Sequence, residues 1–166
     1  VPAFGLATRV LLLHDGQNVF DPDAFFGGWQ ADAALAAGPY GDVLAVAIAN
    51  TADRFDEYTH VADDAGFGQV GGDADAYWAM IDAEILPFVR ARFDVAAATD
   101  DVAVVGSSLG GLVTLYGAYA TPARARCSIG MSSTLGWGSF GPDTDQALVE
   151  LWDAADVASV VLTSGG

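Results

Sequence analysis

Short apolar runs alternate with segments of helical spacing along the whole chain, and this alternation constrains the fold more than any other feature. Strands buried on both faces are predicted by continuous apolar runs at 9–14, 42–49, 101–105, 125–131 and 159–163. Helices between them are predicted by apolar spacing at 29–37, 74–93, 109–120 and 143–155. This order indicates right-handed βαβ units. We expect one α/β domain over residues 1–166, in three layers around a mainly parallel sheet.

One long polar segment, 50–72, interrupts the alternation. It mixes Asp, Gly and aromatic residues and is longer than most connections in compact domains. It follows a predicted strand, and ligands of parallel sheets bind beyond the carboxyl ends of strands. We therefore expect this segment to be a loop over the active-site face. Further along, Pro87 predicts a kink in the helix at 74–93.

Composition excludes several classes of protein and partner. Apolar residues make up 52% of the chain and charged residues 17%, which is unlike a disordered protein. A net charge of −16 repels nucleic acid and anionic membrane surfaces. The longest aliphatic stretch, 43–49, is far shorter than the ~20 residues of a membrane helix. We expect neither nucleic acid nor membrane as a partner, and with no signal peptide visible the compartment stays open.

The sequence predicts no metal and no cofactor. Its acidic stretches at 21–23, 63–64 and 73–75 lack the spacing of a calcium-binding EF-hand loop. No Cys/His cluster suggests zinc, and the chain has no lysine to complete a P-loop.

The strongest chemical signal is Gly106-Ser107-Ser108-Leu109-Gly110, which fits the pattern G-x-S-x-G. A predicted strand runs into the motif and a predicted helix runs out of it, as the nucleophile elbow of α/β-hydrolases requires. The serine of such an elbow sits in a strained turn, so its neighbours must be small, and Gly106 and Gly110 meet this need. The helix N-terminus offers N–H groups to an oxyanion. We predict Ser108 to be a catalytic nucleophile.

Several segments, which follow one another along the chain, resemble the putative-esterase branch of the α/β-hydrolases. They are LLLHDGQNVFDP, GWQADAAL, IANTADRFDEYTH, AYWAMIDAEILPFVRARFDV and VAVVGSSLGGLVTLYGAYATPA. The resemblance covers roughly residues 9 to 166. This branch includes enterochelin-esterase-like and esterase-D-like enzymes, with relatives among feruloyl and acetylxylan esterases and mycolyltransferases. It implies an α/β-hydrolase fold and a carboxylic-ester hydrolase that works through an acyl-enzyme at Ser108, on a small-molecule, sugar or siderophore-type ester.

The resemblance also implies roles for residues around Ser108. The backbone N–H groups of Leu109 and Gln17 would form the oxyanion hole. Substrate-binding positions would be Gly16, Asn18, Tyr58 and Trp137, with Trp29, Arg54 and Glu57 nearby; packing within loops is an alternative for Tyr58, Trp137 and these last three. The strand-end residue His14 is expected to brace its loop.

The remaining members of a catalytic triad do not fall where this fold carries them. The order in α/β-hydrolases is Ser, then acid, then His, yet His14 and His60 both precede Ser108. The resemblance implies strands before residue 1, and a strand and helix after residue 166. We therefore expect a partial domain whose acid and histidine lie outside this sequence, with the last strand, 159–163, as an edge open to homodimer formation. The alternatives are His60 as an unusual base, an acyltransferase with the same nucleophile, or a non-catalytic binding protein.

Overall fold

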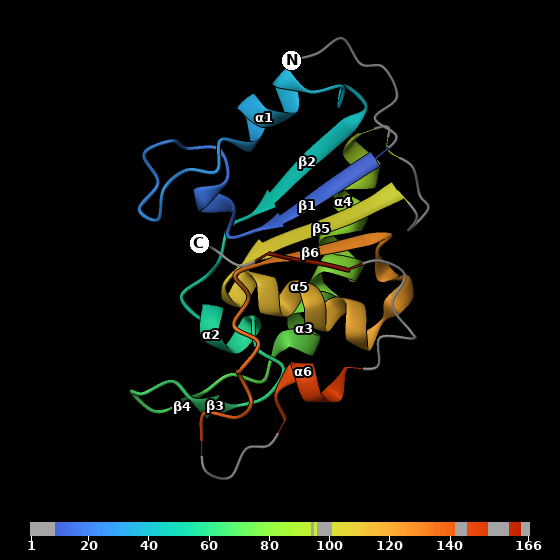
Figure 1. The fold of residues 1–166 in the computed structure, drawn as a ribbon. Coiled ribbons are helices and arrows are strands. Elements are labelled where there is room, and N and C mark those ends of the chain that lie inside the picture. The colour runs from blue at the N-terminus through green and yellow to red at the C-terminus, as the bar shows by residue number, and fades with distance from the viewer. Residues whose placement is uncertain (1–8, 94, 96–100, 142–145, 153–159, 164–166) are drawn as a thin grey trace.

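The computed structural model describes residues 9–93, 95, 101–141, 146–152 and 160–163. Their main feature is a parallel five-stranded sheet with the order β2-β1-β5-β6-β7. The strands are β1 (Arg9–His14), β2 (Val43–Ile48), β5 (Val102–Ser107), β6 (Cys127–Met131) and β7 (Val160–Thr163). Val10 of β1 pairs with Leu44 of β2 and Val102 of β5, which fixes the register at the centre. All strands point the same way, so their carboxyl ends meet at one edge of the sheet (Figure 1). The expected fold class is confirmed.

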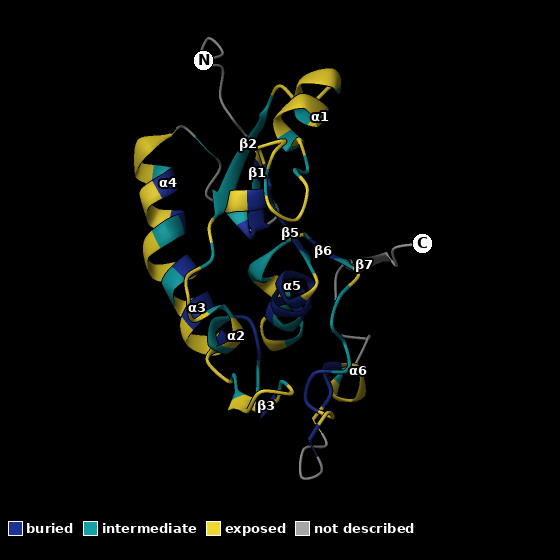
Figure 2. Ribbon diagram, turned by 90° about the vertical axis from the view of Figure 1, so that its left-hand side faces the viewer, coloured by how far each residue is buried: buried dark blue, intermediate teal, exposed yellow. Residues whose placement is uncertain are grey.

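Helices cover the two faces of this sheet unequally. The helices are α1 (Ala31–Ala37), α2 (Arg54–Glu57), α3 (Ala74–Met80), α4 (Leu86–Arg92), α5 (Leu109–Ala120) and α6 (Leu148–Leu151), with 3₁₀ turns η1 (Gly16–Asn18) and η4 (Pro122–Arg124). The α3, α4 and α5 helices lie on one face, and α1 lies on the other (Figure 2). None of these described helices is both long and apolar enough to cross a membrane.

The core lies between the sheet and the α3, α4 and α5 helices that cover one of its faces. Trp78 of α3 packs on Gly117 of α5, where a Cβ would collide with the indole ring. The indole N–H of Trp78 also donates to the Val113 carbonyl at 3.0 Å. On β5, Val102 and Val104 are buried on this side, whereas Ala103 and Val105 are half-buried.

The opposite face of the sheet differs from the sequence prediction of strands buried on both sides. Every residue of β2 is half-buried, and α1 has no buried residue. The apolar run of a strand therefore indicated sheet formation correctly, but it overstated how fully the described part of the chain covers the second face.

One predicted loop contains structure that the sequence patterns did not indicate, and one predicted helix is described only in part. The 50–72 segment, expected to be a loop, holds the α2 helix and an antiparallel hairpin of β3 (Asp63–Asp64) and β4 (Gln69–Val70). The predicted helix at 143–155 lies partly outside the described residues. In its described part, 146–152, the α6 residues are helical.

The helix predicted at 74–93 is divided by a π-helical segment, η2 (Ile81–Ile85), between α3 and α4. Pro87 has no N–H, and in a regular helix its ring would press on the carbonyl four residues earlier. The Leu86 N–H instead bonds to the Ile81 carbonyl, five residues back, which widens the turn just before Pro87. The kink expected at Pro87 thus takes the form of a π turn.

Candidate active site

Ser108 stands at the sharp turn between β5 and α5. Its backbone has φ 57° and ψ −122°, a strained conformation for a residue with a side chain. The turn closes tightly, since a Cβ on Gly106 would collide with the Gly110 carbonyl. Leu109, the first residue of α5, follows directly, and the first N–H groups of a helix have no partner within it. This is the geometry of a nucleophile elbow.

The loop after β6 holds this elbow in place. The Ser108 N–H donates to the Met131 carbonyl at 3.0 Å, and the Thr134 N–H donates to the Ser108 carbonyl at 3.2 Å. The hydroxyl oxygens of Ser108 and Thr134 are 3.5 Å apart, at the outer limit of a hydrogen bond. The Ser108 hydroxyl is thus only weakly held. Sequence analysis missed Thr134, because no local pattern marks a residue that reaches the elbow from a loop elsewhere in the chain.

The η1 turn lies beside the elbow at the end of β1. Asp15 has a left-handed backbone (φ 56°), and its carbonyl accepts the Asn18 N–H at 2.8 Å. This turn leaves the N–H groups of Gly16 and Gln17 without a partner inside it. A Cβ on Gly16 would lie 2.7 Å from the carbonyl carbon of Ala47, so only glycine allows η1 to approach β2 this closely.

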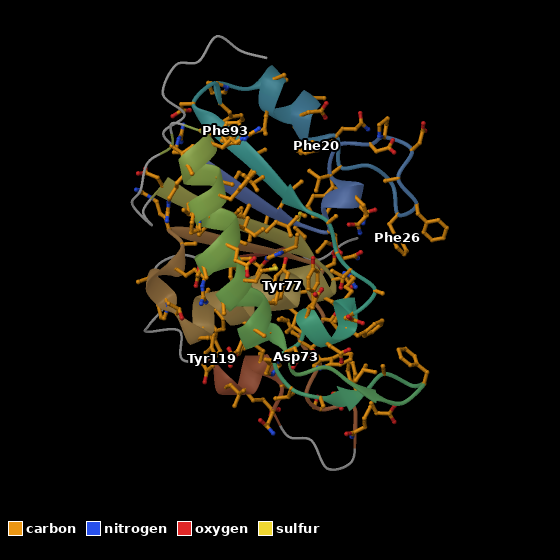
Figure 3. All side chains as sticks on the ribbon, turned by 180° about the vertical axis from the view of Figure 1, so that it is seen from behind. Phe20, Phe26, Asp73, Tyr77, Phe93 and Tyr119 are labelled. Atoms are coloured by element: carbon orange, nitrogen blue, oxygen red, sulfur yellow. The ribbon has the colours of Figure 1, made fainter. Side chains whose placement is uncertain are left out.

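The elbow and the η1 turn line one pocket of about 300 Å³. Its walls are formed by Asp15, Gln17, Asn18, Phe26, Trp29, Asn50, Arg54, Ser107 and Ser108. The pocket therefore joins the predicted nucleophile Ser108 to the predicted site residues Gln17 and Asn18. Phe26 projects from the loop between η1 and α1, at the outer rim (Figure 3).

Two predicted substrate-binding residues lie elsewhere. Tyr58 is fully buried, and its hydroxyl accepts the Asp15 N–H at 3.2 Å. Trp137 is 2% exposed, and its indole N–H donates to the Val61 carbonyl at 2.8 Å. Neither residue lines the pocket, so the structure places both as packing residues. The sequence marked them as aromatics near a site without indicating which way their rings face.

His14 and His60 both have partners away from Ser108. The buried His14 places Nδ1 2.9 Å from the Tyr77 hydroxyl, and burial lowers its pKa to about 4. Tyr77 itself points into the interior (Figure 3). His60 Nε2 donates to the Gln146 carbonyl at 2.7 Å, its ring stacks on Tyr116, and burial lowers its pKa. Neither histidine lines the pocket, which gives no geometric support to His60 as the base. The expected bracing role fits His14.

An ion pair forms the inner wall of the pocket. The Asp15 carboxylate accepts from Arg54 Nε at 2.7 Å and from Arg54 Nη2 at 2.8 Å, and also from the Asn50 amide at 2.9 Å. Burial works against the charge on Arg54, but the hydrogen bonds and charge of Asp15 raise the pKa of Arg54 overall. Sequence analysis did not single out Asp15 or Asn50. Their roles depend on contacts between residues far apart in the chain.

The parallel sheet, the strained serine between a strand and a helix, and the neighbouring turn whose first N–H groups have no partner inside the turn define an α/β-hydrolase. Within that class, the chain belongs to the Putative esterase family, whose model matches residues 5–161.

Known proteins agree with this assignment. Iron(III) enterobactin esterase of Escherichia coli K12 is 30% identical over 93 residues, which are 54% of this chain and 23% of that protein. The enterobactin esterase FES of Shigella flexneri superposes with a TM-score of 0.61 at 23% identity, covering 89% of this chain and 35% of that one. The BES protein of Bacillus cereus gives 0.69 at 16% identity, over 100% and 65%. The chain thus spans about a quarter of the length of the curated relative. Its similarity to the solved structures supports the fold.

Proposed function

We propose that the protein carrying this sequence is a serine hydrolase of carboxylic esters, with Ser108 as its nucleophile. The observation that carries the proposal is the shared pocket, in which a strained serine at a strand–helix turn faces a turn whose first N–H groups have no partner inside the turn. Membership of an esterase family supports the same reaction.

In the proposed reaction, the Ser108 oxygen attacks the ester carbonyl carbon and its proton passes to a general base. The carbonyl oxygen becomes an oxyanion, which the N–H groups of Leu109 and Gln17 stabilise. Collapse of the tetrahedral intermediate expels the alcohol, which takes up the proton, and leaves an acyl-enzyme. Water then attacks the acyl carbon by the reverse proton path and releases the acid and Ser108. The proposal takes the base from a histidine beyond the printed sequence, since His14 and His60 are held elsewhere.

For the substrate, we propose a siderophore-type ester. The support comes from the relative described as an iron(III) enterobactin esterase and from the mixed lining of the pocket. Phe26 and Trp29 offer aromatic surface, whereas Gln17 and Asn18 offer polar groups. Such a lining suits an acyl group with both a ring and hydrogen-bonding substituents.

The test is hydrolysis of p-nitrophenyl butyrate and of enterobactin by the protein that carries this sequence. Ser108→Ala should reduce kcat by about 10⁴-fold or more, because the acyl-enzyme can no longer form. A fluorophosphonate probe should label the parent protein and not the variant. Ser139→Ala, which removes an exposed hydroxyl on the loop after β6, is the matched control. Activity that survives Ser108→Ala would overturn the assignment.

A further inference from the structure

The carboxylate of Asp15 ties together the elements that surround the pocket. Asp15 is 4% exposed and stands between the end of β1 and the η1 turn. Its two oxygens accept a side-on pair of hydrogen bonds from Arg54 of α2, at 2.7 and 2.8 Å. The oxygen nearer Arg54 Nε also accepts from Asn50, which follows β2, at 2.9 Å. One buried carboxylate thus joins three separate segments.

The same cluster reaches both sides of the proposed oxyanion hole. On the nucleophile side, a Cβ built on Gly110 would lie 2.9 Å from Asp15 Oδ2, so the carboxylate lies against the first turn of α5. On the η1 side, the Asn50 N–H donates to the Gln17 side-chain carbonyl at 3.1 Å. Asp15 and Asn50 therefore fix the spacing between Leu109 and Gln17, whose N–H groups are proposed to hold the oxyanion.

The charge of Asp15 would by itself oppose the reaction. A carboxylate on the wall of the pocket repels the negative charge that develops on the ester oxygen, and a partly buried site strengthens that repulsion. Arg54 places a positive charge at hydrogen-bond distance from both carboxylate oxygens. Its guanidinium is supported by the Tyr58 ring, whose centroid lies 5.0 Å from Cζ.

We propose that the Asp15–Arg54 pair positions the oxyanion hole. Asp15 holds the η1 turn against α5, and Arg54 compensates the negative charge of Asp15, which would otherwise repel the oxyanion. The inference rests on the proposed function of Ser108. Asp15 acts through the backbone groups of Gln17 and Leu109, and Arg54 acts through Asp15, so both are positioning residues.

The experiment compares kcat and KM for p-nitrophenyl butyrate among Arg54 variants of the protein that carries this sequence. Arg54→Gln leaves the Asp15 charge uncompensated and should lower kcat by about 100-fold, as the loss of an oxyanion donor does, with little change in KM. Arg54→Lys keeps the positive charge but loses the paired hydrogen bonds that the guanidinium makes to Asp15, so kcat should fall by only about tenfold. Asp15→Asn combined with Arg54→Gln removes both charges and should recover about fivefold over Arg54→Gln alone.

The matched control is Arg9→Gln, which breaks a similar side-on pair with Asp42 at the other end of β1, at 3.0 and 2.6 Å. It should leave kcat unchanged. A raised KM with unchanged kcat in Arg54→Gln would overturn the inference, as would a double variant no faster than Arg54→Gln. If Arg54→Gln fails to fold by circular dichroism, Arg54→Lys decides the matter, and an unchanged kcat there overturns it.

Ser108→Ala, measured in the same assay, separates the two proposals. If Ser108→Ala keeps activity, the proposed function itself fails. If Ser108→Ala abolishes activity while Arg54→Gln behaves like the parent protein, only the positioning role of the Asp15–Arg54 pair fails.

Discussion

At the scale of single residues, His14 is a base that the fold holds in its neutral form. Its ring is fully buried, with ring centroids of Tyr58, Tyr77 and Trp78 each 5.6 Å away. Loss of hydration penalises the imidazolium and lowers the pKa of His14 from 6.5 to about 4, although the nearby Asp15 charge favours protonation. The unfolded chain therefore binds this proton more tightly than the folded protein does.

This difference makes stability depend on pH in a defined direction. Stability linked to His14 should be complete above pH 6.5 and should fall as the pH drops from there toward about 4, by about 3 kcal/mol in total. The measurement is urea unfolding near pH 7.5 and near pH 4.5 for the parent protein and His14→Gln. The parent should lose more stability than the variant between the two conditions. Equal losses would contradict the prediction, and His60→Gln, at a half-buried ring, should show a smaller difference.

At the scale of elements, Asp63 joins the β3–β4 hairpin to the loop after β6. Its carboxylate is fully buried and accepts the N–H groups of Gly138, Phe140 and Gly141 at 2.7, 2.9 and 2.7 Å, and that of Asp64 at 2.8 Å. Burial alone would raise the pKa of Asp63, but these four hydrogen bonds outweigh it and lower the pKa. The ionised carboxylate is therefore the form that holds the two elements together.

Replacing this carboxylate should loosen the contact. Asp63→Asn keeps one acceptor oxygen and turns an amide donor toward backbone N–H groups, at a cost of about 3 kcal/mol in the free energy of unfolding. Asp64→Asn is the matched control, because Asp64 is exposed and its carboxylate accepts the Gly66 N–H at 2.8 Å. Urea or thermal unfolding compares the two. Equal effects would show that Asp63 does not join these elements.

The elements also show how far sequence reasoning reaches. The limits of β1 and α5 were predicted correctly, because apolar runs and helical spacing are local signals, and the motif around Ser108 is local too. The α2 helix and the β3–β4 hairpin escaped prediction, since elements of four and two residues are too short to show a period. The pair of Asp15 with Arg54 joins residues 39 apart and depends on the folded arrangement.

At the scale of the whole molecule, negative charge dominates the surface, with a net charge of −16 over 166 residues. The region around the α2 helix shows how this negative charge is arranged locally. Arg54 of α2 lines the pocket beside Ser108, but its charge is matched by Asp15. The next pocket along α2, of about 430 Å³, is lined by Asp53, Asp56, Glu57 and Asp73. An anionic substrate therefore meets repulsion as it approaches this side of the protein.

Salt should relieve that repulsion and reveal it in the kinetics. Between about 10 mM and 300 mM NaCl, kcat/KM for a p-nitrophenyl ester bearing a carboxylate should rise by about threefold, because the Debye length shrinks from about 30 Å to below 10 Å. A neutral ester of the same length should respond much less. At low salt, Asp53→Asn should raise kcat/KM for the anionic ester, whereas Glu84→Gln, an equal charge change on the exposed side of η2, should do so less. Equal salt responses for the two esters would mean that the charge near α2 does not act on the substrate. The acidity of the chain would then affect only its surface properties.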